Sequence, residues 1–182
     1  MAAQYPIYTT QTQCHDCYKC VRYCPVKSIK IENGPAQVIP ENCVTCGTCV
    51  PVCPAQAKYN RNDADQGKHL LNSQNTPSYL SLAPAWISSF KHLHPSQLTQ
   101  AIRRLGFAGA SETALGAQEV SAKVSDMMLS KPDLYISSAC PAAVNYIRQY
   151  LPQYADTITP VLSPVQSHAK ILRSIYGHNI NE

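Results

Sequence analysis

Two groups of four cysteines near the start of the chain constrain its fold more than any other feature. Residues 14–25 read CHDCYKCVRYCP and residues 43–54 read CVTCGTCVPVCP. Both follow the pattern C-x2-C-x2-C-x3-C-P, and the second repeats the first at an offset of 29 residues, so the segment is an internal duplication. The pattern predicts a duplicated cysteine-bound unit, for which iron–sulfur clusters, zinc ions and disulfides are the alternatives.

The spacing within each group favours an iron–sulfur cubane. Three thiolates separated by two residues can wrap three of the four iron corners from one tight loop, and the fourth cysteine then points toward the other cluster. Structural zinc sites usually pair C-x2-C units across a longer gap and have no use for a third cysteine two residues further on. Disulfides are rare in a reducing compartment, where clustered cysteines more often bind metals or act in redox chemistry.

The duplicated run resembles the bacterial two-cluster ferredoxins, in which the fourth cysteine of each run binds the other cluster. The resemblance covers roughly residues 10–60 and implies two 4Fe–4S clusters in an α+β ferredoxin-like dicluster domain over residues 1–59. The first implied ligand set is Cys14, Cys17, Cys20 and Cys53, and the second is Cys43, Cys46, Cys49 and Cys24. Between the quartets, apolar and polar residues alternate around Asn33 and Gly34, which predicts a hairpin.

Charge and hydropathy argue against several classes of partner. The chain of 182 residues has a net charge of +4 with no long basic run. It therefore lacks the clustered basic residues typical of nucleic-acid binding. Its first residues, MAAQYPIYTTQTQ, lack the basic and apolar regions of a secretory signal, and no apolar run approaches the roughly 18–20 residues of a membrane span. These features predict a cytoplasmic protein without a membrane span.

The second half of the chain alternates strand and helix patterns. Residues 60–77 are polar and predict a linker, with one helical turn around His69–Leu71. From residue 78 onward, SYLSLAP and DLYISSA have strand patterns. Four segments have helix patterns: HPSQLTQAIRRLGF, GAQEVSAKVSDMMLS, PAAVNYIRQYL and SPVQSHAKILRSIYG. This alternation predicts an α/β domain of β-α-β units with a small parallel sheet.

A ninth cysteine, Cys140, lies between a predicted strand and a helix that begins at Pro141. A lone cysteine of this kind is often buried and structural, although the ends of parallel strands and the N-termini of helices also suit ligands and reactive thiolates. Residues 78–182 resemble the first part of the catalytic domain of iron-only hydrogenases through SLAPAW, IRRLGF, SSACPAAV and LSPVQSHAKIL. The resemblance makes Cys140 one ligand of a third 4Fe–4S cluster, whose other ligands lie in family motifs that this sequence lacks.

Departures from the catalytic members of that family point to its regulatory, sensory branch. Catalytic members carry a proton-transferring cysteine before the ligand, where this chain has Ala139, which has no exchangeable proton. The acidic residues expected in the preceding helix are not matched, and Glu119 stands about one turn early. Thr159 remains a candidate hydroxyl on a proton path. Gln166 and His168 are candidates for the cluster environment, with a partly exposed helix histidine as the alternative for His168.

Together these features predict an iron–sulfur electron-transfer protein that belongs to a regulatory or sensory iron-only hydrogenase homologue. The alternatives are a fragment of a catalytic hydrogenase, and a ferredoxin module fused to a degenerate docking domain. A redox partner protein is expected, together with a second chain or a missing C-terminal region that completes the hydrogenase-like domain. By itself, the chain is expected to lack hydrogenase activity.

Overall fold

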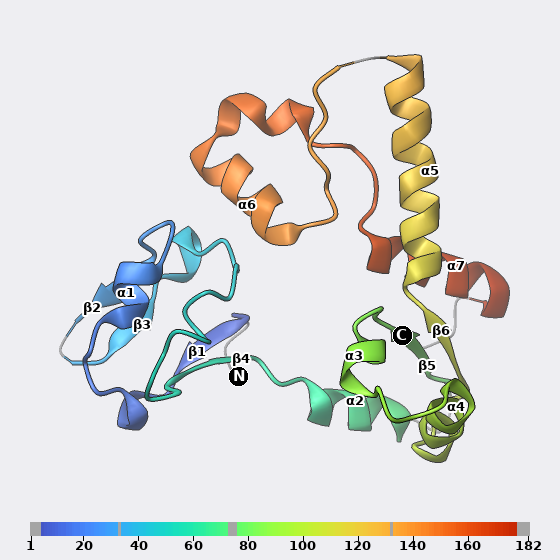
Figure 1. Cartoon of the computed structure of the whole chain (residues 1–182), viewed down its shortest axis with the longest axis horizontal. Coiled ribbons are helices and arrows are strands. Elements are labelled where there is room, and N and C mark those ends of the chain that lie inside the picture. The colour runs from blue at the N-terminus through green and yellow to red at the C-terminus, as the bar shows by residue number, and fades with distance from the viewer. Residues whose placement is uncertain (1–4, 33, 73–75, 132, 178–182) are drawn as a thin grey trace. The chain divides into compact units, whose positions relative to one another are not determined.

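The computed structural model of the chain describes residues 5–32, 34–72, 76–131 and 133–177 (Figure 1). These residues form two compact units. The first unit draws on residues 1–62 and 140–155, and the second on residues 63–139 and 156–182. Neither unit is therefore one continuous stretch of sequence.

The cysteine-rich part of the first unit consists of two small antiparallel sheets and short helices. Strands β1 (Ile7–Thr9) and β4 (Lys58–Asn60) form one sheet, and β2 (Ile29–Ile31) and β3 (Ala36–Val38) form the other. The β2–β3 pair confirms the predicted hairpin, although Asn33 itself lies outside the described residues. Helix α1 (Lys19–Tyr23) lies within the first quartet, and a 3-10 turn precedes each quartet, at Gln11–Gln13 and at Pro40–Asn42. The duplication in sequence is thus also visible in the fold.

Thiols form much of the core of this part. The buried cluster consists of Ile7, Cys20, Cys24, Ile29, Ala36 and Cys49. Such a core contains few large apolar side chains, and small domains of this kind usually depend on metals or disulfides for stability.

Helix α6 (Pro141–Tyr150) also belongs to the first unit. It begins at Pro141, as the sequence predicts. Proline suits the first helical position because an N–H there would have no hydrogen-bond acceptor within the helix. The Tyr150 hydroxyl donates a hydrogen bond of 2.8 Å to the Asn42 carbonyl. This bond links α6 to the segment that leads into the second quartet. A 3-10 helix at Pro152–Thr157 follows α6.

The second unit contains a two-stranded parallel sheet with helices around it. Its strands are β5 (Tyr79–Leu82) and β6 (Gly109–Glu112), and its helices are α2 (Ala64–Leu71), α3 (Trp86–Ser89), α4 (Pro95–Arg104), α5 (Ala114–Ser130) and α7 (Pro164–Tyr176). The order β5, α4, β6 is a β-α-β unit, which confirms the predicted fold class. The sequence analysis missed β6, because Gly-Ala-Ser-Glu has little β propensity. Helix α2 is longer than the single turn expected in the linker.

The strand predicted in DLYISSA is wrong, because the segment forms only one bridge, between Ile136 and Ile158. The ladder stops there for a local reason. The next amide, Ser138 N–H, donates 3.1 Å to the Thr159 hydroxyl instead of to a backbone carbonyl. Pro160 also lacks an N–H that a longer ladder could use.

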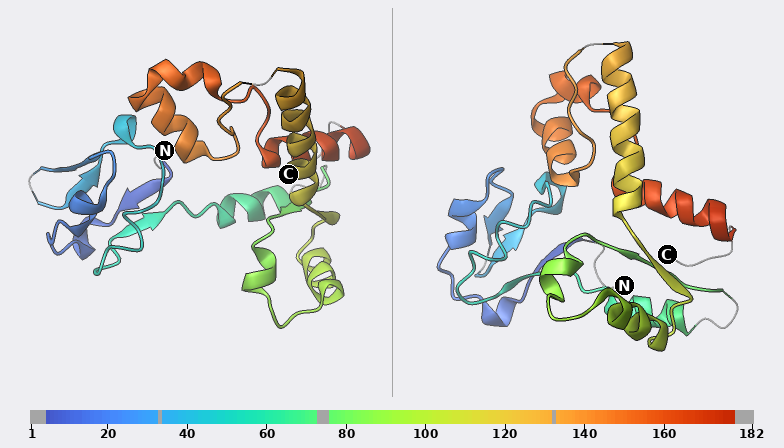
Figure 2. Two further views of the ribbon diagram at one scale, coloured as in Figure 1. Left: turned by 45° about the horizontal axis from the view of Figure 1, so that its top comes forward. Right: turned by 45° about the vertical axis from the view of Figure 1, so that its right-hand side comes forward.

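Helices α5 and α7 cross in close contact within the second unit (Figure 2). At the crossing, Gly116 faces the start of α7, and a Cβ added there would lie 2.1 Å from the Pro164 carbonyl oxygen. The N-terminus of α7 confirms the predicted cap: the Gln166 amide N–H bonds to Ser163 Oγ, and Gln166 Oε1 accepts from the Ser163 amide. A glycine is therefore required on α5 for α7 to approach this closely.

Candidate metal centre

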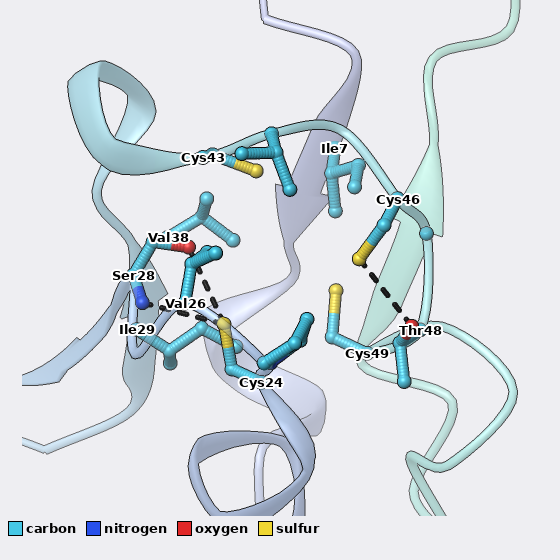
Figure 3. Close-up of a pocket in the computed structure, with 13 residues that line it drawn as sticks. Ile7, Cys24, Val26, Ser28, Ile29, Val38, Cys43, Cys46, Thr48 and Cys49 are labelled. Atoms are coloured by element: carbon cyan, nitrogen blue, oxygen red, sulfur yellow. Dashed lines mark hydrogen bonds between the residues drawn. The ribbon is translucent and has the colours of Figure 1, made fainter. Parts of the chain in front are cut away.

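Four cysteines from both repeats surround one cavity in the first unit. Its empty volume is about 300 Å³. Figure 3 shows the four sulfur atoms directed toward the space between them. They belong to Cys24, Cys43, Cys46 and Cys49. The structure therefore brings together the whole second ligand set, in which Cys24 comes from the other repeat.

The loops that carry the cysteines have the same unusual backbone in both repeats. Three residues with left-handed φ recur at the offset of 29. The pairs are Asp16 (49°) with Thr45 (58°), Tyr18 (54°) with Gly47 (75°), and Lys27 (54°) with Gln56 (50°). Left-handed residues in tight loops turn successive N–H groups toward one concavity, and such concavities occur at many iron–sulfur sites. The loop backbone thus fits an anionic group between the cysteines.

Hydrogen-bond donors already lie next to several cysteine sulfurs. The Ser28 amide donates 3.3 Å to Cys24 Sγ, and at the equivalent position the Ala57 amide donates 3.2 Å to Cys53 Sγ. The Ser28 hydroxyl also lies 3.4 Å from Cys24 Sγ, whereas Ala57 has no hydroxyl. Further contacts join the Thr45 amide to Cys43 Sγ (3.4 Å) and the Thr48 hydroxyl to Cys46 Sγ (3.3 Å). Donors of this kind stabilise thiolates and tune the potentials of bound clusters.

Burial and hydrogen bonding shift the thiol pKa values in opposite directions. Burial raises the pKa of Cys49 to about 11, and it also raises that of Cys20, while the positive charge of Lys58 opposes both shifts. Burial would raise the pKa of Cys24 as well, but hydrogen bonds from Ser28 hold it below its ordinary value. Because metal ligands bind as thiolates, filling this site must release the proton that Cys49 holds at neutral pH.

The first ligand set is less enclosed. Cys20 is buried, Cys14 and Cys53 are half-buried, and Cys17 is exposed. Among the described residues, no three His, Cys, Asp or Glu side chains converge closely enough to share a single metal ion.

Cys140 is exposed and caps the N-terminus of α6. The alternative of a buried structural cysteine is therefore wrong. Its carbonyl accepts a hydrogen bond of 3.0 Å from the Val144 amide, as an N-cap carbonyl does. The thiol is accessible for a ligand, and its role as a cluster ligand stays a prediction.

The neighbouring candidates Ala139 and Thr159 lie in the second unit. Ala139 lines an open cleft along α5, together with Ser137 and Pro164. Thr159 is buried, and its hydroxyl donates 3.2 Å to Ser138 Oγ, which in turn donates 2.9 Å to the Val161 carbonyl. This chain of hydroxyls ends on a carbonyl, which fixes the backbone after the Ile136 bridge.

Glu119, on α5, is held by two hydrogen bonds of 2.5 Å, one from Lys123 Nζ and one from Ser167 Oγ. The hydrogen bond from Lys123 lowers the pKa of the Glu119 carboxyl most, and the hydrogen bond from Ser167 lowers it further. The carboxylate therefore links α5 to α7 near the Gly116 crossing. Gln166, another candidate for the cluster environment, uses its side-chain oxygen in the α7 cap.

His168 is completely buried, so the alternative of a partly exposed helix histidine is wrong. Its Nδ1 lies 2.8 Å from Ser81 Oγ on β5, and its Nε2 lies 3.0 Å from Ser111 Oγ on β6. The Ser81 hydroxyl also lies 2.8 Å from Thr113 Oγ1. The imidazole thus joins α7 to both strands of the parallel sheet.

We expect His168→Ala to destabilise the second unit by about 2–4 kcal/mol, because it leaves a cavity and deprives two half-buried serine hydroxyls of a partner. Trp86 is the sole tryptophan of the chain and lies in this unit, so its fluorescence reports the unfolding midpoint. The matched control is His92→Ala, at an exposed position, where a change within about 0.5 kcal/mol is expected. Equal midpoints for the two variants would contradict the structural role of His168.

The sequence analysis missed the residues that act on the cysteine sulfurs. Ser28, Thr45, Thr48 and Ala57 all lie between or after the cysteines, and none belongs to the motif itself. At the offset of 29 residues, Ser28 stands opposite Ala57, and this difference between the repeats is visible in the sequence. The contact of either residue with a sulfur is not.

Comparison with known proteins finds short matches to the cysteine-rich part. A ferredoxin of Saccharopolyspora erythraea is 41% identical over 44 residues, which are 24% of this chain and 42% of that protein. One component of an ion-translocating oxidoreductase complex of Methanosarcina acetivorans is 39% identical over 44 residues, 24% of this chain and 17% of that protein. The matched part thus spans less than half the length of these relatives. A solved [FeFe]-hydrogenase structure aligns with a TM-score of 0.48 and 20% identity, covering 63% of this chain and 34% of that chain.

Two protein families match adjacent parts of the chain. Residues 6–54 match the 4Fe-4S dicluster domain, which contains both quartets. Residues 74–182, more than half of the chain, match the family described as iron only hydrogenase large subunit, C-terminal domain. No helix among the described residues is long and apolar enough to cross a membrane. With its 4Fe–4S dicluster domain followed by this second domain, the chain belongs to the iron-only hydrogenase large-subunit family.

Proposed function

We propose that this chain is a cytoplasmic electron-transfer protein with two 4Fe–4S clusters and forms part of a regulatory or sensory iron-only hydrogenase homologue. The observation that carries the proposal is the cavity between Cys24, Cys43, Cys46 and Cys49. Ligands from both repeats at one cavity match the exchange of ligands in two-cluster ferredoxins. The proposed second site uses Cys14, Cys17, Cys20 and Cys53.

When bound, such clusters accept and donate single electrons. The chain's own residues determine how they do so. The cysteines bind the clusters as thiolates, and the amides of Ser28, Thr45 and Ala57 donate to their sulfurs. Ile7, Ile29 and Ala36 pack around the buried thiols and limit the access of water. Cys17 and Cys46 are exposed, so a redox partner protein can approach each proposed site at one of these cysteines.

The regulatory assignment is supported by the residues beside Cys140. Ala139 has no group that can accept or release a proton, so a proton cannot pass through this position by side-chain exchange. We propose that Cys140 binds a third 4Fe–4S cluster, with its remaining ligands supplied by a second chain or by a C-terminal region beyond this sequence. In this arrangement Cys140 would hold the third cluster, and Ala139 beside it would offer no side-chain group for proton transfer.

Anaerobic reconstitution of the full chain tests the electron-transfer proposal. About eight irons per chain are expected, together with the paramagnetic resonance signals of two interacting reduced cubanes after dithionite treatment. Zinc in place of iron, or only about four irons, would contradict two clusters. Hydrogen evolution with reduced viologen after cofactor maturation is expected to be absent, and activity of this chain would refute the regulatory assignment.

The unequal hydrogen bonding of the two repeats leads to a further prediction. Ser28→Ala removes a hydroxyl next to Cys24 Sγ, so the cluster bound through Cys24 should lose a donor that stabilises its reduced form. If this bond strengthens by about 1 kcal/mol on reduction, the midpoint potential falls by about 40 mV for one electron. Potentiometric titration followed by paramagnetic resonance measures this shift.

Ala57→Ser is the matched variant in the other repeat. It places a hydroxyl next to Cys53 Sγ and should raise the potential of the other cluster. A shift of the same cluster by both variants would disagree with the exchanged assignment of Cys24 and Cys53.

A further inference from the structure

A lysine is buried in the core that holds the cysteines. Lys58 begins β4 and is 3% exposed. Its ammonium donates to Thr9 Oγ1 on β1 and to the Ala36 carbonyl on β3. Both acceptors are uncharged, and no carboxylate among the described residues forms an ion pair with Lys58. Burying an ammonium without a negative partner costs several kcal/mol, so its charge points to an anionic group nearby.

Cysteines of both ligand sets pack in the core that holds this charge. Ala36, which accepts from Lys58, packs in the same buried cluster as Cys20 and Cys49. Cys20 belongs to the first ligand set and Cys49 to the second. One cation therefore lies within electrostatic range of both sites.

The duplication shows that packing alone does not require a lysine here. At the offset of 29, the equivalent of Lys58 is Ile29, which begins β2 and is buried in the same core. An aliphatic side chain thus fills the equivalent place in the other repeat. Lys58 breaks the internal symmetry of the unit at a buried position, where a charge is most costly and also least screened by solvent.

We propose that the positive charge of Lys58 stabilises the reduced forms of both clusters and thereby raises both midpoint potentials. This inference rests on the proposed function. During reduction, one electron from an external one-electron donor enters a cluster, no covalent bond forms or breaks, and the net charge of the site becomes more negative by one. The fixed positive charge of Lys58 favours that form of either cluster.

The test replaces Lys58 by methionine in the full reconstituted chain, because methionine keeps an unbranched apolar side chain and removes the charge. Potentials are measured by titration with dithionite and mediators, followed by paramagnetic resonance. With an effective dielectric constant of about 20, one buried charge changes a one-electron equilibrium by about tenfold or more. Both midpoint potentials are therefore expected to fall by at least about 59 mV.

Two further variants separate charge from structure. Lys58→Arg retains the charge and should keep both potentials near their original values. Lys30→Met removes one positive charge from the neighbouring strand β2, where the Lys30 side chain is 43% exposed and pairs with Glu32. Solvent screens this exposed pair, so a much smaller shift is expected.

The possible results distinguish the inference from the function on which it rests. Unchanged potentials in Lys58→Met with both clusters present would show that Lys58 is only a cross-link between strands. A fall in just one potential would refute its shared role. If Lys58→Met loses its clusters, Lys58→Gln retains a donor for the Ala36 carbonyl without the charge, and the same fall in both potentials is required. An original chain without two clusters would refute the proposed function itself.

Discussion

Replacing Cys24 with alanine is expected to lower the iron content of the reconstituted chain from about eight to about four atoms. The lost cluster should be the one held by the cysteines of the other repeat, because Cys24 lies at the cavity with Cys43, Cys46 and Cys49. Iron analysis and quantitative paramagnetic resonance of the reduced protein measure the loss. Cys140→Ala is the control and should leave this content unchanged.

Double variants test the exchange directly. Cys24→Ala combined with Cys46→Ala removes two ligands of one proposed cluster, so about four irons should remain. Cys24→Ala combined with Cys17→Ala removes one ligand from each cluster, so almost all iron should be lost. Cys17 and Cys46 occupy equivalent positions in the repeats and are both exposed. If the Cys24/Cys46 double variant instead lost almost all iron and the Cys24/Cys17 variant kept about four irons, each quartet would bind its own cluster.

A second large effect is expected at the crossing of α5 and α7. Gly116→Ala places a Cβ 2.1 Å from the Pro164 carbonyl oxygen and 2.6 Å from the His168 amide nitrogen. Both contacts are with backbone, which cannot move aside as a flexible side chain can. The helices must separate, and overpacking of this kind costs about 1–3 kcal/mol or more. Thermal unfolding followed by Trp86 fluorescence should show a lower midpoint.

Gly67→Ala provides the matched control. Gly67 lies inside α2, and a Cβ added there would meet nothing within 4 Å. Alanine has the higher helix propensity, so this variant should be neutral or more stable by about 0.5–1 kcal/mol. A Gly116→Ala chain as stable as the original would mean that the close approach of the helices is not required.

The sequence predicts the cysteine-rich part well because covalent ligand chemistry fixes its spacing. The pattern of Cys14 through Pro25, repeated once, predicts the duplicated loops, and the alternation around Gly34 predicts the hairpin between them. The side-chain donors to sulfur lie close in sequence to their cysteines, Ser28 four residues after Cys24 and Thr48 two residues after Cys46, but the cysteine motif does not specify them. Nothing local to Ser28 or Lys58 indicates burial, since serine and lysine are usually exposed.

Prediction was poorer where pairing with a distant segment decides the structure. Residues 134–138 have a strand pattern, yet the Thr159 hydroxyl takes the amide of Ser138 and ends the ladder. Conversely, Gly109–Glu112 has almost no strand propensity and becomes a strand because β5 supplies its partner. Burial of His168 was likewise invisible, because its partners Ser81 and Ser111 lie far away in the sequence.

The division between the two units has a consequence for the order in which they form. The first unit draws on residues 1–62 and again on residues 140–155, so most of the second unit is synthesised between its two parts. Until Tyr150 has been synthesised, the hydrogen bond from its hydroxyl to the Asn42 carbonyl cannot form. Cluster insertion before that point would act on a unit that still lacks α6.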